Sequence, residues 1–258
     1  MGDQAANNYK VRAVERAARI LASLDDEHPE RTLAEIARVT ELPKSTAFRL
    51  LVTLEGCGFV EQTADGDRYR LGLRLASLGL MALGRLSIRG EALPLMTRLV
   101  ERFQETCSLG IFDQGTVLDI EVVRGDQVLT VNSRVGGRFP LHSTASGKAL
   151  LAFLPRAVVE SVLAGPLEAC TENTITSPAQ LRKELELIRE RGYAVDDGEY
   201  GLGVRAVAAP ISDIDGNVIA EISMPGPSAR LTPDRVPGIA QALIEVADAI
   251  SGKRRQRV

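Results

Sequence analysis

The chain has 258 residues, of which 45% are hydrophobic, and it carries 31 Lys and Arg against 34 Asp and Glu. This is the composition of a weakly acidic globular protein. The length fits one large or two modest domains, and we predict two domains. It contains no apolar stretch as long as a membrane span, and its polar first residues show no signal peptide, so we expect a cytoplasmic protein without a membrane partner. Cys57, Cys107 and Cys170 are too few and too widely spaced for a disulfide framework or a zinc cluster, and we interpret them as small apolar side chains with no metal bound.

Residues 1–10 are polar, and we predict that they are disordered and precede the first helix. A helix is predicted over residues 11–24, with an apolar face formed by Val14, Ala17, Ala18 and Leu21. Thr32 and Glu35 form a T-x-x-E capping box, which predicts a second helix over residues 33–39. A short turn then leads to a third helix.

The third helix is predicted to begin at Pro43, a residue that suits the first helical position. One of its faces is apolar and consists of Ala47, Leu50, Leu51 and Leu54. The opposite face carries Lys44, Ser45, Phe48 and Arg49. A short turn between two such helices is typical of a helix-turn-helix, whose second helix enters the major groove of DNA.

A β-hairpin is predicted over residues 59–71, because two alternating runs flank Asp65-Gly66. The hairpin places Arg68 and Arg70 where a wing can contact phosphates, which makes residues 11–72 a winged helix-turn-helix domain. Residues 1–86 carry 12 basic and 12 acidic side chains, so a small helical domain with solvated basic residues is the alternative interpretation. Because this balance gives a monomer little non-specific affinity for DNA, we expect the protein to dimerise.

Residues 73–88 are predicted to form an apolar linker helix. Leu75, Leu78 and Met81 recur at helical spacing, and small residues between them allow another helix to approach closely. Because its glycines weaken it, we expect packing against a partner to hold this helix, as a connector and dimer element.

The segment of residues 89–250 has the pattern of an α+β domain with an antiparallel sheet. Helices are predicted at 89–106, 146–154, 155–163, 178–191 and 233–250, and strands at 109–113, 116–123, 128–133, 193–195, 204–212 and 218–224. Residues 87–250 carry 15 basic against 22 acidic side chains, so this domain is not expected to face DNA. The basic tail at residues 251–258, with Lys253, Arg254, Arg255 and Arg257, is predicted to be solvated and disordered.

The segment HSTASGKALLAFL predicts a capped helix whose first amides face a small anion. Either Ser143 or Thr144 can cap it, leaving the N–H groups of Ala145, Ser146 and Gly147 without partners inside the helix. An ordinary cap facing solvent is the alternative. A phosphate-binding P-loop does not fit, because His142 and Ala149 occupy the positions that need Gly and Ser or Thr.

The segment GYAVDDGEYGLGVRAVAAP joins acidic residues to a strand. Asp196, Asp197 and Glu199 can accept hydrogen bonds from a ligand or from Lys148 or Arg205, or can simply form a solvated turn. By the period of two, one face of this strand and the next presents Val204, Ala206, Ala208 and Ser223, an apolar lining with few polar groups. His142 has no paired nucleophile and Cys107 no reactive setting, so no catalytic residue is predicted.

Three ordered segments carry a resemblance to a known family, the IclR-type bacterial transcriptional regulators. LAEIARVTELPKSTAFRLLVTL is similar to the family's DNA-reading helices, HSTASGKALLA to its effector-domain signature, and GYAVDDGEYGLGVRAVAAPI with ISMPGP to its C-terminal half. The resemblance implies a winged helix-turn-helix, a linker helix and a GAF-like effector-binding domain. It also implies homodimers or homotetramers, operator DNA as partner, a small organic acid as effector, and no cofactor.

Carried over by motif, the resemblance implies two sets of site residues. The DNA contacts are Lys44, Ser45, Thr46, Phe48, Arg49 and, on the wing, Arg68. The effector contacts are Thr144, Ala145, Ser146, Gly147, Asp196, Val204, Ala206 and Ser223.

Two positions depart from the family pattern. Phe48 stands where a polar residue is frequent, so it is better suited to a thymine methyl than to a polar base edge. Pro225 replaces a second serine of the pocket, which favours a more apolar, aromatic acid. The expected function is a ligand-controlled transcriptional repressor; a metabolite-handling enzyme with an accessory DNA-binding domain is the alternative, and a constitutive DNA binder with an empty sensor fold is a third reading.

Overall fold

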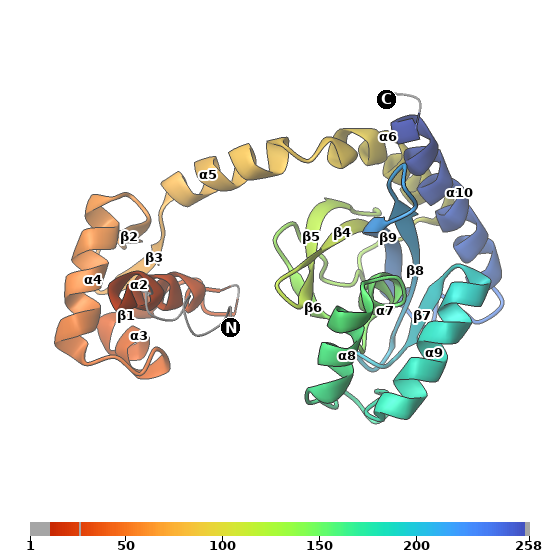
Figure 1. Cartoon of the computed structure of the whole chain (residues 1–258). Coiled ribbons are helices and arrows are strands. Elements are labelled where there is room, and N and C mark those ends of the chain that lie inside the picture. Colours follow the sequence, from red (N-terminus) through yellow and green to blue (C-terminus); the bar gives the residue numbers. More distant parts are fainter. Residues whose placement is uncertain (1–10, 26, 256–258) are drawn as a thin grey trace. The chain divides into compact units, whose positions relative to one another are not determined.

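The computed structural model describes residues 11–25 and 27–255, and for residues 253–255 it describes the backbone alone. The chain divides into two compact units, Met1–Leu86 and Ser87–Val258 (Figure 1). Across the described ranges, no helix has both the length and the apolar character needed to cross a membrane.

The first unit is a winged helix-turn-helix, as the sequence predicts. Its elements are α2 (Arg12–Ala22), β1 (Arg31–Thr32), α3 (Leu33–Val39), α4 (Lys44–Gly56), β2 (Val60–Gln62), β3 (Arg68–Leu71) and α5 (Leu73–Gly84). The two strands of the wing pair antiparallel, and β1 joins them in the order β1-β3-β2. The capping box is present, since Thr32 accepts from the Glu35 amide while the Glu35 carboxylate accepts from the Thr32 amide.

The core of this unit joins α2, α3, α4 and the wing. Its buried side chains are Ile20, Leu24, Ile36, Leu42, Ala47, Leu51, Leu54, Val60 and Tyr69. The predicted inner face of α2 is partly wrong. Val14 is 66% exposed and Ala18 is also exposed, while Ala17 and Leu21 pack beside the buried Ile20. The reason is that α2 contacts the core only through its C-terminal half.

Helix α5 has no buried residue within its own unit. Its exposed apolar side chains include Leu73, Leu80 and Met81. The single linker helix predicted over residues 73–88 is wrong at its end, because α5 ends at Gly84 and α6 begins at Ser87. Two non-helical residues, Arg85 and Leu86, therefore separate the helices.

The second unit is an antiparallel sheet covered by helices on both faces. Its helices are α6 (Ser87–Phe103), α7 (Ala145–Leu151), α8 (Arg156–Ala164), α9 (Pro178–Arg191) and α10 (Val236–Arg255). Its strands are β4 (Cys107–Asp113), β5 (Thr116–Val123), β6 (Arg138–Pro140), β7 (Ala194–Asp197), β8 (Val204–Ser212) and β9 (Val218–Pro227). The sheet order is β6-β5-β4-β9-β8-β7, and all its pairs are antiparallel.

The helices cover the sheet in two groups. Helices α6 and α10 pack together and contact β4, β5, β8 and β9, whereas α7 contacts the sheet beside α9, and α8 packs on α9 (Figure 1). The core beneath α7 includes Leu141, Ala149 and Leu151 from the α7 segment and Ala194, Ala206 and Ala208 from the strands. This confirms the predicted α+β class.

The strand predicted over residues 128–133 is absent from the described structure. Val128 and Leu129 are exposed, and the edge of β5 is paired instead by β6, with Val117 opposite Phe139. A turn at Gly136 and Gly137 brings β6 to that edge, since the Gly136 amide donates to Asp119 O and the Asp119 amide to Gly137 O. The apolar residues of the 128–133 segment predicted a strand, but residues 138–140 occupy the sheet edge with which it would have paired.

The predicted disorder of the basic tail is wrong for its first residues. Helix α10 continues to Arg255, so residues 251–255 are helical, while Arg257 lies outside the described residues. Ser251 explains part of the extension, because its hydroxyl donates to Ala247 O and accepts from the Ser212 amide, which ties the end of α10 to β8.

Gly147 is required where α7 passes over β6. A Cβ at this position would lie 2.5 Å from the Cα of Leu141 and closer still to the Pro140 carbonyl, both of them backbone atoms. We expect Gly147→Ala to destabilise the second unit by about 1 to 3 kcal/mol, because overpacked backbone must shift. The measurement is the thermal unfolding of wild type and variant.

Gly238→Ala in α10 is the matched control. No atom lies within 4 Å of a Cβ there, so the change should be neutral or stabilising by about 0.5 to 1 kcal/mol. Equal unfolding midpoints for Gly147→Ala and wild type would contradict the close approach of α7 and β6.

Candidate DNA-reading surface and effector site

Helix α4 presents the predicted DNA-reading face. The helix begins at Lys44, one residue later than predicted, with Pro43 as its N-cap, and the turn before it contains Glu41 with a left-handed φ of 55°. Four predicted contact residues, Lys44, Ser45, Phe48 and Arg49, are exposed, while Thr46 is half-buried. Phe48 is 48% exposed, so a large aromatic ring stands on this face without core contacts to account for it.

The arginines of the wing already have acidic partners. Arg68 lies 3.8 Å from the Glu35 carboxylate, and its guanidinium also donates to Glu30 O. Arg70 lies 3.4 Å from the Glu61 carboxylate. Because these side chains are about half exposed, such pairs are weak and can be exchanged for phosphate contacts.

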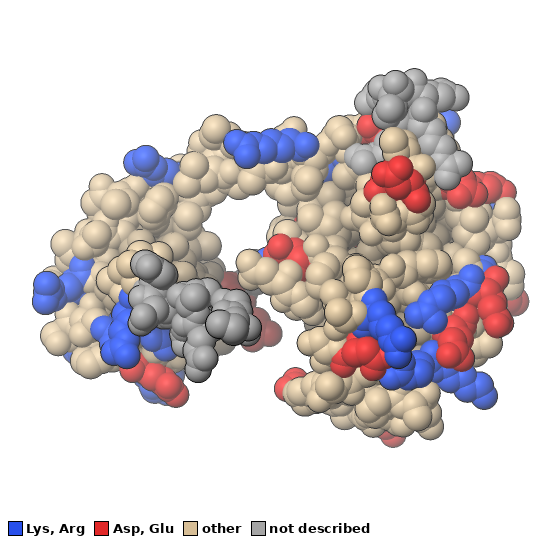
Figure 2. Space-filling model, viewed as in Figure 1, with Lys and Arg blue, Asp and Glu red and all other residues tan. Residues whose placement is uncertain are grey.

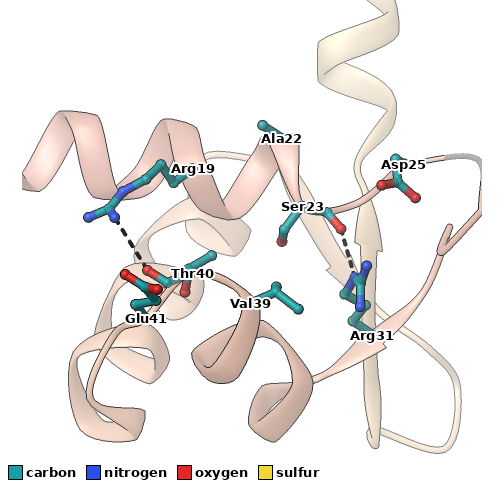
Figure 3. A pocket seen from close by; sticks show the side chains of 8 residues that line it. All are labelled: Arg19, Ala22, Ser23, Asp25, Arg31, Val39, Thr40 and Glu41. Carbon is teal, nitrogen blue, oxygen red and sulfur yellow. Dashed lines mark hydrogen bonds between the residues drawn. The ribbon is translucent and has the colours of Figure 1, made fainter. Parts of the chain in front are cut away.

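A surface cavity of about 350 Å³ lies on the first unit beside the helix-turn-helix (Figure 3). Two arginines that line it donate to backbone carbonyls: Arg19 to Thr40 O at 3.4 Å and Arg31 to Ser23 O at 2.8 Å. These bonds tie α2 to the end of α3 and to β1. The residues around the cavity therefore hold the helix-turn-helix in place.

The charged surface over α8 and α9 of the second unit is electrically compensated. Figure 2 shows basic and acidic side chains interleaved over this region. Arg182 pairs with Glu160 at 2.8 Å and Arg191 with Glu184 at 2.7 Å. This face of the described chain offers no continuous basic stripe of the kind that binds nucleic acid.

The helix predicted from HSTASGKALLAFL is α7, and Thr144 caps it. The Gly147 amide donates to Thr144 Oγ1 at 2.9 Å, while that hydroxyl donates to Pro140 O at 2.8 Å. The expectation that the Gly147 amide lacks a partner is therefore wrong, because the Thr144 cap satisfies it. Ala145 is buried, and Ser146 is half-buried.

Lys148 of the same helix anchors the acidic loop. Its Nζ is buried and donates to Glu199 Oε1 and, at 2.6 Å, to Val195 O. Burial raises the pKa of Glu199 to about 7, although the Lys148 ammonium lowers it. Asp197 pairs with Arg205. The loop acids therefore bond Lys148 and Arg205, which is one of the arrangements predicted for them.

Asp196 supports the same loop. It is 2% exposed, and its Oδ1 accepts from the amides of Glu199 at 2.7 Å and Tyr200 at 3.4 Å. Burial raises the pKa of Asp196 to about 6, which these amides and Lys148 oppose. In this structure Asp196 thus shapes the loop, while its Oδ1 is already occupied.

Strands β8 and β9 place the predicted lining on one face. Ala208 lies opposite Ser223 and Ala206 opposite Pro225, so Val204, Ala206, Ala208 and Ser223 share a side. Ser223 is the polar centre of that face. Its hydroxyl accepts from Ser146 at 2.9 Å and bonds Ser108 of β4 at 2.8 Å.

Two buried acids lie beside these serines, and sequence reasoning missed both. Glu221 on β9 and Asp119 on β5 flank Gly110 of β4 in the sheet register, so all three occupy one face. We name Ser108, Ser146, Ser223, Asp119 and Glu221 the serine–carboxylate cluster. The missed signal was Glu221 at an apolar position of IAEISM, two residues before Ser223 and therefore on the same face.

Burial makes both acids of the cluster harder to ionise than they are in water. Burial raises the pKa of Glu221 well above its ordinary value, and the Asp119 carboxylate raises it further. Burial likewise raises the pKa of Asp119 to about 7, against the guanidinium of Arg134. Titratable groups with strongly perturbed pKa values are common at ligand-binding sites.

His142 and the three cysteines are the remaining side chains of reactive type. His142 is 8% exposed, and its Nε2 lies 2.9 Å from Glu168 O. Cys107 is buried, and burial raises the pKa of its thiol, which agrees with its interpretation as a small apolar side chain, whereas Cys57 and Cys170 are exposed. The described residues contain no group of three His, Cys, Asp or Glu that could hold a metal ion.

A winged helix-turn-helix with an exposed reading helix, joined to a sheet domain with a buried polar cluster, places the chain among DNA-binding regulators. Residues 13–64 match the IclR helix-turn-helix domain, and residues 80–252 match the bacterial transcriptional regulator IclR C-terminal domain. The chain therefore belongs to the IclR family of bacterial transcriptional regulators, which confirms the resemblance.

Individual relatives agree with this assignment. The chain is 34% identical over 242 residues to the HTH-type transcriptional regulator XynR of Escherichia coli (strain K12), which covers 93% of this chain and 96% of the relative. It is 31% identical over 245 residues to the transcriptional repressor IclR of the same organism, covering 94% and 89%.

Solved structures show the same fold. An IclR homolog from Microbacterium hydrocarbonoxydans, complexed with 4-hydroxybenzoate, has a TM-score of 0.83 at 32% identity and covers 95% of this chain and 99% of that chain. An IclR transcriptional regulator from Alicyclobacillus acidocaldarius has a TM-score of 0.84 at 30% identity, covering 95% and 100%. XynR, IclR and the Alicyclobacillus protein are each named as a transcriptional regulator or repressor.

The pairing of Lys148 with Glu199 generates a stability prediction. Lys148→Met should destabilise the second unit by about 1 to 3 kcal/mol at neutral pH, because Glu199 Oε1 and Val195 O are left buried without their donor while Glu199 takes up a proton. Adding Glu199→Gln should restore part of the loss, since the carboxyl group that needs the cation is then gone. Thermal unfolding of both variants measures this.

Arg182→Met is the control for that measurement. It breaks the exposed pair with Glu160 and should cost no more than about 1 kcal/mol. A Lys148→Met protein as stable as this control would show that the buried pair does not hold the loop.

Proposed function

We propose that the chain is a repressor that binds double-stranded operator DNA through α4 and the wing, with operator affinity controlled by a small organic acid bound in the second unit. The observation that carries the DNA-binding half is the exposed face of α4, where Lys44, Phe48 and Arg49 stand outside a well-packed core. Relatives named as repressors, among them the acetate operon repressor of Salmonella typhimurium, support the direction of control.

Helix α5 supports dimerisation through the first unit. It is a helix of 12 residues with no buried side chain in its own unit, and several large apolar residues on it are exposed. A helix that is apolar and unsupported gains its stability by packing on another surface. We infer a homodimer or homotetramer, because two reading helices are also what a symmetric operator requires.

The effector half rests on the face formed by β8, β9 and α7. Ser146, Ala206 and Ser223 meet there, and Pro225 shares the face, which makes it more apolar than one with a second serine. Together with Thr144, Ala145, Gly147, Asp196 and Val204, they form the proposed effector site. The 4-hydroxybenzoate bound by the Microbacterium relative supports a small, aromatic acid as ligand.

We further infer that the chain is not an enzyme, carries no cofactor and acts in the cytoplasm. Its relatives are transcriptional regulators, and His142 and Cys107 have no geometry for nucleophilic catalysis. Turnover of the bound acid by the purified protein would favour the enzyme instead.

Arg49 is the residue whose loss tests the reading face most directly. Arg49→Ala should weaken specific operator binding by about 1 to 3 kcal/mol if the guanidinium contacts a base edge. Fluorescence anisotropy on the DNA upstream of the chain's own gene measures the affinity. Arg182→Ala in the second unit is the control and should bind as wild type; an Arg49→Ala protein that does the same would remove Arg49 from the interface.

Ser146 tests the effector site, because it is half-buried and its hydroxyl donates to Ser223 at the polar centre of the proposed lining. Ser146→Trp should abolish the response of operator binding to the active acid while leaving binding itself intact, since the indole fills the site. Ser161→Trp, on the exposed side of α8, should respond normally. A normal response from Ser146→Trp as well would place the effector elsewhere.

A further inference from the structure

The serine–carboxylate cluster is short of hydrogen-bond donors. The Ser146 and Ser223 hydroxyls and the Gly110 amide lie near the Glu221 carboxyl group and lower its pKa, but among the described residues none meets hydrogen-bond geometry with its Oε1 or Oε2, and none reaches Oδ2 of Asp119. Glu221 is 0% exposed and Asp119 is 2% exposed, so water outside the protein does not satisfy these atoms. Buried polar atoms without partners are costly, so each calls for an explanation, and a bound ligand that supplies donors is one.

The sheet is shaped around the Glu221 carboxylate. Gly110 lies opposite Glu221 on β4, and a Cβ at Gly110 would clash with Oε1 of Glu221 and lie 2.6 Å from Val117 Cγ1. The side chain therefore lies across the face of β4, toward Asp119 on β5. Acids are rare in protein interiors. Here the absence of a side chain at Gly110 leaves the space that the Glu221 side chain occupies.

The charge of the cluster is also incomplete. The Arg134 guanidinium lowers the pKa of Asp119, whereas no cation is among the groups that shift the pKa of Glu221 most. One carboxyl group of the cluster, that of Glu221, thus forms no ion pair with a Lys, Arg or His among the described residues. A simple carboxylate bound here would place its negative charge beside these acids without supplying donors.

We propose that the effector carries a protonated amine that binds Glu221 and Asp119. An ammonium group supplies three N–H donors and one positive charge, which matches three unfilled carboxyl oxygens and one carboxyl group without a cation. The inference rests on the proposed function and narrows its ligand: the organic acid is an amino acid or a related acid that bears an amine. Ser146 is the half-buried member of the cluster, whose other members are buried.

The experiment uses matched ligands on the full-length protein. One set is 4-(aminomethyl)benzoate, 4-methylbenzoate and 4-hydroxybenzoate; two others are alanine with propionate and lactate, and phenylalanine with 3-phenylpropionate and 3-phenyllactate. Calorimetric titration of each should show at least one amine-bearing member that binds about tenfold or more tightly than both of its matches, as expected for a charge-assisted hydrogen bond in a buried site.

Glu221→Gln keeps the size of the side chain and removes its charge, so it should abolish the preference for the amine. Glu245→Gln, on the exposed side of α10, is the matched control and should keep the preference. Circular dichroism establishes that each variant is folded. If Glu221→Gln does not fold, Asp119→Asn replaces it, with the same expected loss.

Three results would overturn the proposal: no amine-bearing member binds, an amine-free match binds as tightly as the amine, or a folded Glu221→Gln protein keeps the preference. Operator retardation measured with the same ligands tests the proposed function separately from the ammonium site. An amine that binds without altering retardation supports the ammonium site and contradicts the regulatory function, whereas an amine-free acid that alters retardation does the reverse.

Discussion

The pairing of β4 with β9 is the constraint on which the second unit depends. It joins two three-stranded halves, β6-β5-β4 and β9-β8-β7, that come from distant parts of the chain. Its register sets Ser108 opposite Ser223 and Gly110 opposite Glu221. A slip of one residue would turn both β9 side chains to the opposite face, toward α6 and α10. The polar cluster thus exists only in this register, and α7 then closes it through Ser146.

Two adjacent residues of helix α7 make different structural contacts. Gly147 permits close approach to β6, and Lys148 reaches the loop after β7 through Glu199. These contacts fix the helix between the two halves of the sheet, so Ser146 is held against Ser223. A ligand that displaced this serine contact would act on an element tied to both halves. Such a ligand controls DNA binding only if it binds the two states of the protein unequally.

Local chemistry made the first unit predictable from its sequence. The capping box at Thr32, the proline before α4 and the Asp65-Gly66 turn each fix a boundary by short-range interactions. Predictions that needed long-range information were weaker. Residues 128–133 have strand-like apolar residues, but the sheet edge belongs to residues 138–140. Glu221 and Asp119 were not recognised as a pair, since they lie about a hundred residues apart and meet only across β4.

The most direct measurement is the binding of the full-length protein to the DNA upstream of its own gene, in competition with a scrambled duplex of equal length, with and without the matched acids. A ligand-controlled regulator binds the upstream DNA saturably and in preference to the scrambled duplex, and one ligand changes that affinity. Equal affinity for both duplexes, unchanged by every ligand, would contradict the proposal that α4 reads an operator under effector control.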